Sequence, residues 1–256
     1  IKTSEERHII AFTMHHIICD GWSIHVFMND MMHLYNAFEN EMEPRLPELR
    51  IQYKDFAKWQ NDQLEAVSQS SHKEYWLNRL SDQPEPLRLP EDYTRPAYKT
   101  QNGGKVRKTY SSIVYKQLAQ LSQDRDGTLF TGLLAVLKTL MFYYTRQEDM
   151  TIGTPIAGRE HIDLENQIGC YINTLALRTK FSGTDCFDSL LTKVSKETFD
   201  AYSHQIYPFD DLVDQLSFAK DLSRSELFDV MIVLQNTGRS QTEDAPQGSL
   251  AIRPFE

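Results

Sequence analysis

The chain has 256 residues, which suits one large domain or two smaller lobes. Its 36 acidic residues outnumber its 27 basic residues, and the formal net charge of −9 argues against nucleic-acid binding and against anionic membrane surfaces. The 3 cysteines are an odd number without the pattern of a disulfide framework, which favours a reducing, cytoplasmic setting. We therefore expect neither a nucleic-acid partner nor a membrane partner.

The first third of the chain contains one predicted strand and several predicted helices. The apolar run from Arg7 to Met14 predicts a strand. The pattern then changes to a helical period, with one apolar face formed by Ile24, Phe27, Met28, Met31, Leu34, Tyr35 and Phe38. Further helices are expected around Tyr53–Gln60 and Lys73–Leu80. A proline-containing connection is expected over 39–47 and a longer one over 81–104.

The remainder of the chain alternates between helical and strand-like patterns. Helices are predicted over 113–123, 128–144, 186–204 and 209–216, and strands over 150–156, 171–178 and 228–235. The apolar stretch Leu129–Tyr144 is too short and too interrupted for a membrane span and reads as a buried helix. Residues 238–248 are predicted to form a polar loop. Alternation of this kind predicts an α/β layered sandwich.

The junction between the first strand and the first helix carries the candidate chemistry. It reads His15-His16-Ile17-Ile18-Cys19-Asp20-Gly21-Trp22-Ser23. If the strand continues through His16, the two imidazoles point to opposite faces, so one faces a cleft while the other packs inside. Gly21 permits a sharp turn, and Asp20 or Ser23 caps the helix. The helix start favours a neutral, proton-accepting imidazole.

Asp20 would favour the protonated imidazolium unless a cation already pairs with it. The pattern therefore predicts that Asp20 forms an ion pair with an arginine and that the Asp20 carboxylate shapes the loop. A metal site is the competing interpretation, because histidine, cysteine and aspartate are all metal ligands. Adjacent histidines on a strand diverge, and no second cluster has ligand spacing, so we expect no metal.

The segment His15–Gly21 resembles the HHxxxDG motif of the condensation domains of non-ribosomal peptide synthetases, which also occurs among chloramphenicol-acetyltransferase-like acyltransferases. Other blocks of that family follow in its order: Tyr53–Gln60 (YKDFAKWQ), Leu89–Pro96, Ile152–Arg159 (IGTPIAGR), Ile168–Leu175 (IGCYINTL), His204–Phe209 and Arg224–Asn236. The resemblance covers nearly the whole chain.

The resemblance implies a chloramphenicol-acetyltransferase-like two-layer sandwich of two lobes that face each other across a channel. It assigns residues 1–80 to the C-terminal part of the first lobe, 81–104 to the inter-lobe connection and 105–256 to the second lobe. The match begins at the active-site strand, so the chain is expected to be part of a longer protein, and the other half of the first lobe is an expected partner.

The resemblance also implies an activity. Such domains join two aminoacyl or peptidyl thioesters, and each substrate is tethered to the 4′-phosphopantetheine of a carrier domain. No directly bound cofactor is expected. The implied partners are an upstream donor carrier, a downstream acceptor carrier and an adjacent adenylation domain. The product class is that of antibiotics and other secondary metabolites.

The resemblance assigns the general-base or amine-positioning role to the second histidine, His16, and leaves the choice between these two roles open. We assign His15 to structure. Asp20 is expected to form a salt bridge with Arg159, and Gly21 to let backbone approach the reacting centre. Candidates for the substrate channel are Trp22, Asn173 and Asn236. Ordinary core packing is an equal alternative for Trp22, and at least one of the two asparagines is expected merely to fix a backbone crossing. Arg224 is expected to meet a carrier domain, the other lobe or only water.

Two alternatives stay open. The first is an epimerisation domain, which shares the fold and the histidine motif but inverts an α-carbon. The second is a non-catalytic carrier-docking module of the same fold, which usually lacks the second histidine. Because His16 is present and the later blocks match, amide formation is the preferred interpretation.

Overall fold

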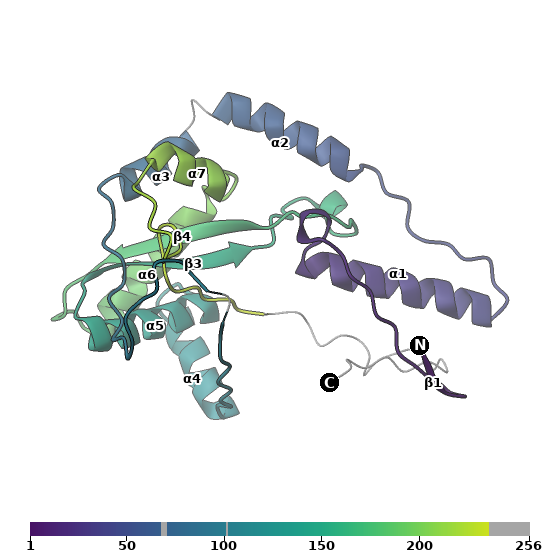
Figure 1. Ribbon diagram of the computed structural model, residues 1–256, viewed down its shortest axis with the longest axis horizontal. Helices are drawn as coiled ribbons and strands as arrows, with labels where there is room; N and C mark the ends of the chain where they lie inside the picture. The colour runs from purple at the N-terminus through teal and green to yellow at the C-terminus, as the bar shows by residue number, and fades with distance from the viewer. Residues whose placement is uncertain (68–70, 101, 236–256) are drawn as a thin grey trace. The chain divides into compact units, whose positions relative to one another are not determined.

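The computed structural model describes residues 1–67, 71–100 and 102–235 (Figure 1). The chain forms two compact units. Unit 1 contains residues 1–60, 159–172 and Gln235 of the described chain, and unit 2 contains residues 61–158 and 173–234 apart from the gaps. These units do not coincide with the lobe boundaries predicted at residues 80 and 104, which remain predictions about the family architecture.

Unit 1 begins with a short antiparallel hairpin of β1 (Lys2–Ser4) and β2 (Arg7–His8). The strand predicted to run from Arg7 to Met14 is therefore wrong beyond His8. A strand needs a neighbour to complete its ladder of hydrogen bonds. Within the described residues, the backbone bonds of this hairpin end with those between Ile1 and Ile9. Ile10 and Phe12 are correspondingly exposed.

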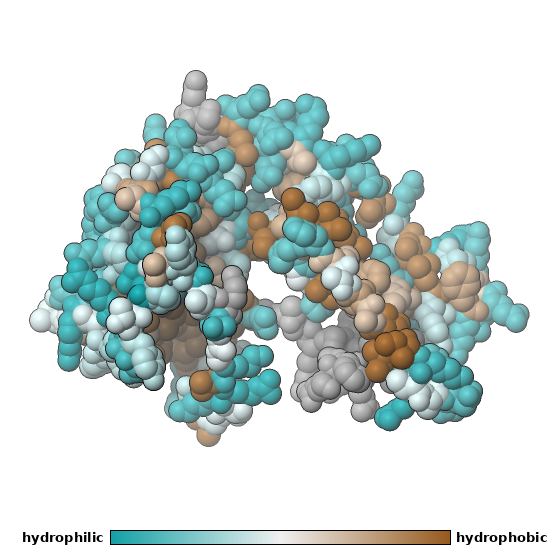
Figure 2. All heavy atoms as spheres, viewed as in Figure 1, coloured by the Kyte–Doolittle hydropathy of each residue, from teal (hydrophilic) through white to brown (hydrophobic). Residues whose placement is uncertain are grey.

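The histidine motif of unit 1 leads from a one-turn 3-10 helix, η1 (His16–Ile18), into helix α1 (Gly21–Glu39). The predicted helix exists, and its predicted apolar face is only partly buried, with Phe27, Met28, Met31 and Leu34 half-buried. Its buried residues are Ser23, Val26 and Ala37, whereas Ile24, Tyr35 and Phe38 are exposed. Hydrophobic residues also reach the surface that Figure 2 shows. The first turn of α1 is fixed by hydrogen bonds from Trp22 and Ser23 to the segment that contains η2 (Ile162–Leu164).

A small aromatic core holds the rest of unit 1. Helix α2 (Tyr53–Val67) starts in this unit, and its Phe56 is buried with Leu164 and Tyr171. The rings of Phe56 and Tyr171 lie 4.7 Å apart, and those of Tyr53 and Tyr171 lie 5.1 Å apart. These contacts hold residues 164–171 against the start of α2.

Unit 2 contains the other predicted elements. They are α3 (Ser71–Leu80), α4 (Ser112–Gln123), α5 (Leu129–Thr145), β3 (Asp149–Ile156), β4 (Asn173–Lys180), α6 (Phe187–Tyr202) and α7 (Phe209–Leu216). Strands β3 and β4 pair antiparallel along their full length, from Asp149 opposite Lys180 to Ile156 opposite Asn173. Helix α5 packs against α4 and α6, α6 also contacts β4, and α3 contacts α7. The mixed α/β prediction is confirmed.

The strand predicted over 228–235 is wrong in unit 2, apart from a single parallel bridge between Gly153 and Met231. Gly153 donates to Val230 O and accepts from Ile232 N–H. The next residue of β3 on the same edge is Pro155, which has no N–H to offer. The ladder therefore cannot extend along β3 in that direction.

Lys138 is a charged residue inside the core of unit 2. Its side chain is completely buried, and Nζ donates to Met150 O at 3.2 Å and to Leu177 O at 2.8 Å. The ammonium thus bridges β3 and β4 from the middle of α5. Desolvation lowers its pKa to about 7, although the nearby charge of Glu197 acts in the opposite direction.

None of the helices in the described residues has the length and apolar composition that a membrane crossing requires.

This burial predicts a pH-dependent stability. Between pH 7 and 10.5 the unfolded lysine holds its proton while the folded one has lost it, so folding becomes more favourable as the pH rises. We expect the free energy of unfolding of the full-length protein to gain up to about 1.4 kcal/mol per pH unit from this group. Denaturant unfolding at several pH values should show this slope, and Lys138→Met should remove it. Equal slopes for the two proteins would contradict the assignment.

Candidate functional site

The histidine motif of unit 1 ends in a capped helix start. Asp20 is the N-cap of α1 and forms a capping box with Ser23. Its Oδ1 accepts from the Ser23 N–H at 2.8 Å and lies 2.7 Å from the Ser23 hydroxyl. The sequence left Asp20 and Ser23 as alternative caps, and the structure makes Asp20 the cap and Ser23 its capping-box partner.

The Asp20 carboxylate also holds an arginine from far along the chain. Nη2 of Arg159 lies 3.1 Å and 3.2 Å from the two carboxylate oxygens, and the exposed fractions of the two side chains are 1% and 0%. The structure thus brings together the two residues whose pairing was expected from the family resemblance. Nη1 of Arg159 donates to the carbonyls of Leu164 and Gln167, which ties the loop after Arg159 to the same cation.

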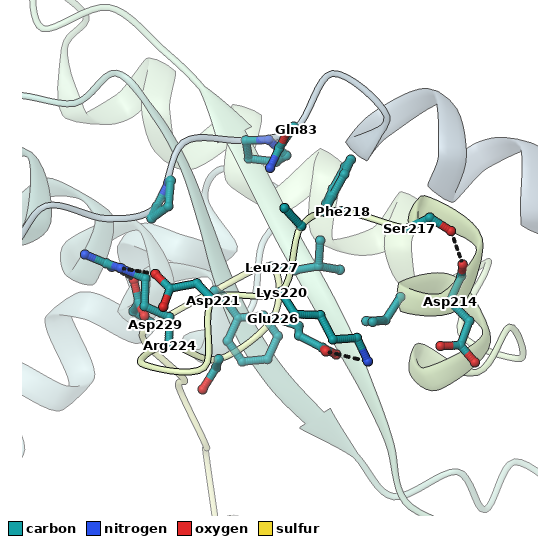
Figure 3. Close-up of a pocket in the computed structure, with 16 residues that line it drawn as sticks. Gln83, Asp214, Ser217, Phe218, Lys220, Asp221, Arg224, Glu226, Leu227 and Asp229 are labelled. Carbon is teal, nitrogen blue, oxygen red and sulfur yellow. Dashed lines mark hydrogen bonds and ion pairs between the residues drawn. The ribbon is translucent and has the colours of Figure 1, made fainter. Parts of the chain in front are cut away.

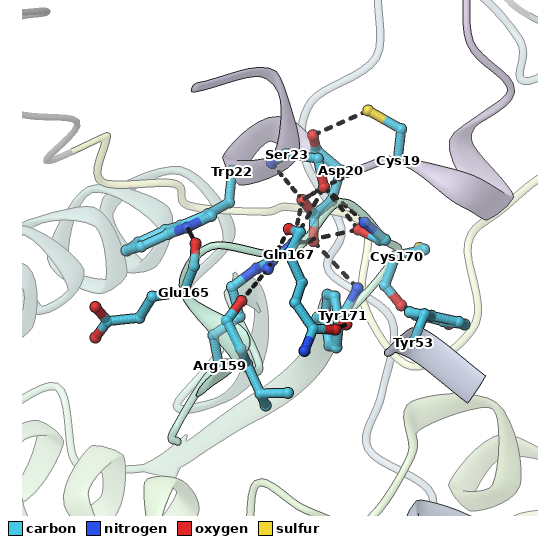
Figure 4. A network of polar contacts seen from close by, with 12 residues as sticks. Cys19, Asp20, Trp22, Ser23, Tyr53, Arg159, Glu165, Gln167, Cys170 and Tyr171 are labelled. Carbon is cyan, nitrogen blue, oxygen red and sulfur yellow. Dashed lines mark hydrogen bonds and ion pairs between the residues drawn. The ribbon is translucent and has the colours of Figure 1, made fainter. Parts of the chain in front are cut away.

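Backbone groups complete this network, as the close-up of its polar contacts shows (Figure 4). The Tyr171 N–H donates to Asp20 Oδ2 at 3.1 Å, and the Ser23 hydroxyl accepts from the Gly169 N–H at 3.0 Å. The guanidinium of Arg159 lies 4.1 Å from the centre of the Tyr171 ring, a cation–π distance. The start of α1 and the segment that ends at Tyr171 are thereby held together through backbone groups.

Electrostatics keep the Asp20 carboxylate ionised. Burial by itself would raise the pKa of Asp20. The hydrogen bonds from Ser23 and Tyr171, together with the charge of Arg159, outweigh that effect and lower the pKa below its ordinary value. An ionised and fully engaged carboxylate is a structural group.

The two histidines of the motif lie in a tight turn. His15 is the N-cap of η1, and its Nδ1 accepts from the Ile17 N–H at 3.1 Å. His16 is the first residue of η1, and both imidazoles are exposed. The expected divergence of the two rings across a strand is therefore wrong, because the backbone is not extended at these positions. His15 still serves the backbone, while His16 presents its ring at the surface of unit 1.

The residues around the imidazoles differ in their surroundings. Trp22 is 44% exposed, and its indole N–H donates to Glu165 O at 2.8 Å, so it is neither core nor free. An added Cβ at Gly21 would meet nothing within 4 Å. The glycine is thus not required by local packing, and its approach to a reacting centre stays a prediction. Cys19 is buried beside the cap.

Two further candidates lie in unit 2 or outside the described residues. The Asn173 amide donates to the carbonyls of Gln205 and Tyr207, and its Oδ1 accepts from the Phe209 N–H. The same oxygen also accepts from the Thr174 N–H at 2.8 Å. Asn173 thus fixes the turn before α7 and has no hydrogen-bonding group left for a substrate. Asn236 and the predicted loop over 238–248 lie outside the described residues.

Arg224 also braces unit 2 internally, in contrast to the expectation that it meets another domain or water. It forms an ion pair with Asp229 and lies near Asp221, at the edge of a cavity of about 460 Å³ in unit 2 (Figure 3). Lys220 and Glu226 line the same cavity and lie 3.6 Å apart. The charges of this cavity are thus largely paired with one another.

Sequence reasoning missed the contribution of Gln167 and Tyr171 to the unit 1 network. The hydroxyl of Tyr171 donates to Gln167 Oε1, and the Gln167 amide donates to Ile51 O. No periodic signal marks such long-range contacts. Among the described residues, no group of three or more histidine, cysteine, aspartate or glutamate side chains is placed to hold a metal.

The comparison with protein families identifies the chain. The family model "Condensation domain" matches residues 1–253. The chain belongs to the condensation domain family. A linear gramicidin synthase of Brevibacillus parabrevis is 44% identical over 256 residues, and gramicidin S synthase 2 of Brevibacillus brevis is 38% identical over 256 residues. Each alignment covers 100% of this chain, but only 5% and 6% of those relatives.

Solved structures share the fold of this condensation domain chain. A four-domain nonribosomal peptide synthetase bound to AMP and glycine matches 90% of this chain with a TM-score of 0.80 at 23% identity, over 17% of its own length. The X-domain from teicoplanin biosynthesis matches 85% of this chain with a TM-score of 0.76 at 26% identity, over 49% of its own length. The chloramphenicol-acetyltransferase-like fold expected from the motifs is confirmed.

The buried pair predicts a large effect of Asp20→Ala. The substitution leaves the Arg159 charge buried without its carboxylate, which is expected to cost about 3–5 kcal/mol in the free energy of unfolding. Denaturant unfolding of the full-length protein measures this loss. Glu5→Ala is the matched control, because the Lys2–Glu5 pair is exposed and should contribute less than about 1 kcal/mol.

Denaturant unfolding repeated at lower pH tests the charge state of Asp20. Because the folded-state pKa of this carboxyl is lowered, its stabilisation is present above pH 3.8 and is lost as the pH falls below that value. Similar losses for Asp20→Ala and Glu5→Ala at neutral pH would mean that the buried pair does not organise the unit.

Proposed function

We propose that this chain forms amide bonds between two carrier-tethered thioesters in non-ribosomal peptide synthesis. Membership in the condensation domain family and the similarity to gramicidin synthases support this reaction class. The observation that carries the proposal is the exposed imidazole of His16, held next to a buried and rigidly capped helix start.

In the proposed step, the amine of the acceptor attacks the thioester carbonyl of the donor. The new C–N bond forms as the C–S bond breaks, and the sulfur leaves as a thiol. An α-amino group has a pKa near 8, so at neutral pH it is largely protonated and unreactive. His16 receives a proton from the amine, or holds the neutral amine in line. The proton that the nitrogen loses as the amide forms ends on the departing sulfur, so the products are an amide and a thiol.

The Asp20–Arg159 pair has an indirect role in this proposal. The pair fixes the N-cap of α1, and η1 with His16 lies directly before this cap. Because Asp20 is ionised and already saturated with donors, it does not compete with the imidazole for the proton of the amine. A positioned base contributes about 10²–10⁴-fold to such a step.

The proposed substrates arrive on carrier domains. We infer that an upstream carrier presents the donor and a downstream carrier presents the acceptor, each on its 4′-phosphopantetheine, with an adenylation domain nearby to load one of them. One structural relative is a four-domain nonribosomal peptide synthetase, which supports this setting. The chain itself is proposed to bind no cofactor, since the thioesters already supply the activated acyl group.

Two other functions are weighed as outcomes of the same assay. An epimerisation domain would exchange the α-hydrogen of a tethered residue without forming an amide. A docking module would do neither, and one relative points to it, because the X-domain from teicoplanin biosynthesis has also been solved in complex with OxyB. The presence of His16 favours amide formation over docking alone.

We expect His16→Ala to lower amide formation in the full-length protein by about 10²-fold or more. The assay combines the protein with a donor and an acceptor loaded on carrier domains and follows the amide product by mass spectrometry. His25→Ala, which removes another exposed imidazole on α1, is the matched control and should leave the rate unchanged. An unchanged rate for His16→Ala would refute the role of this residue, and solvent deuterium in the substrate without amide would indicate epimerisation.

A further inference from the structure

The imidazole of His16 meets a side chain from a distant part of unit 1. Its Nδ1 lies 3.9 Å from Sγ of Cys170, within the longer range of a weak hydrogen bond to sulfur. Within the residues that the structure describes, this is the one hydrogen-bond contact of the His16 ring. The opposite ring nitrogen, Nε2, has none there.

The buried network fixes the sulfur side of this contact. The carbonyl of Cys170 accepts from the Tyr53 hydroxyl at 3.0 Å. The N–H of the next residue, Tyr171, donates to Asp20 Oδ2. The backbone of Cys170 is thus held on both sides, and this fixes the point from which its half-buried side chain extends.

The same network fixes the imidazole side. The carbonyl of His16 accepts from the Cys19 N–H at 3.3 Å, which closes the turn of η1. Cys19 directly precedes Asp20, the N-cap of α1 that Arg159 holds. Asp20 thus helps to place both the Cys170 sulfur and the His16 ring, so the distance between them depends on Asp20.

A neutral imidazole has one N–H and one lone pair, and the partner of one nitrogen decides which tautomer is present. We propose that Cys170 is a positioning residue whose sulfur accepts the Nδ1–H of His16 and so leaves the lone pair on Nε2 for the incoming amine. This inference rests on the proposed function, in which His16 receives or orients that amine.

The neighbouring ionisable groups leave this contact undisturbed. Nδ1 of His15 accepts from the Ile17 N–H, Asp20 is paired with Arg159, and the Tyr53 hydroxyl donates to a carbonyl. Burial and the nearby charge of Asp20 raise the pKa of the Cys170 thiol. The sulfur is therefore a neutral thiol at physiological pH, a weak acceptor that does not compete for the thioester as a thiolate.

Two substitutions separate positioning from packing. Cys170→Ser keeps an acceptor at this position but is smaller and less apolar, whereas Cys170→Val keeps an apolar, somewhat larger side chain and removes the acceptor. We expect Cys170→Val to lower kcat for amide formation about three- to ten-fold with KM for both loaded carriers unchanged, the effect of one weak hydrogen bond. Cys170→Ser should stay within about two-fold of the original kcat. Cys186→Ala, at an exposed cysteine in unit 2, is the control for loss of a thiol.

The reverse order, with Cys170→Val active and Cys170→Ser impaired, would show that the side chain only packs and would overturn the proposal. Equal kcat values for both variants and the original protein would overturn it as well. His16→Ala is measured in the same assay, so a failure of the proposed function is recognised separately, because the rate would then survive loss of the imidazole itself. Circular dichroism and unfolding midpoints of each variant identify losses that arise from misfolding.

Discussion

The organisation of unit 1 depends on one buried ion pair between residues 139 positions apart, Asp20 and Arg159. Such a pair is a poor source of net stability, because removing two charges from water costs nearly as much as their attraction returns. What it does provide is a strict geometric requirement, since either charge left alone in this place is strongly unfavourable. The pair therefore selects one arrangement of the histidine turn against the segment that ends at Tyr171. Everything placed on those two segments, including the His16 ring and the Cys170 sulfur, inherits that arrangement.

The same requirement explains why the motif's most acidic group is not its reactive one. Asp20 accepts from Ser23, Tyr171 and Arg159, and this set of donors leaves its carboxylate oxygens occupied. A carboxylate in that state has a lowered pKa and no lone pair aimed at solvent. The imidazole of His16 is exposed, and its one hydrogen-bond contact among the described residues is the weak one to sulfur. Rigidity and reactivity thus belong to different residues within one short segment. The supporting hydrogen bonds are made by Asp20, so they hold the proposed base in place without occupying its lone pair.

Local signals in the sequence were enough for the elements that satisfy their hydrogen bonds internally or with a neighbour. The helices of unit 2 follow from hydrophobic period alone, and capping chemistry narrowed the start of α1 to Asp20 or Ser23. The two failed strands depend on partners that periodicity does not encode. The first lacks a neighbour beyond His8 in the described residues, and the second meets an edge of β3 that Pro155 interrupts. The role of Arg159 was reached only through the family resemblance, and that of Gln167 was not reached, because both act across long sequence separations.

Asn173 in unit 2 follows the same logic as Asp20 in unit 1. It lies in a family block that suggests substrate contact, yet its amide N–H groups donate to the carbonyls of Gln205 and Tyr207. Its oxygen accepts from the N–H groups of Thr174 and Phe209. A polar side chain that satisfies four backbone groups replaces a stretch of regular secondary structure, and an apolar substitution would leave those groups unpaired. Polar motif residues of this chain therefore serve mainly to hold irregular backbone. Of the motif side chains in the described residues, the imidazole of His16 is the proton acceptor that this scaffolding leaves open, and for that reason the proposed chemistry is assigned to it.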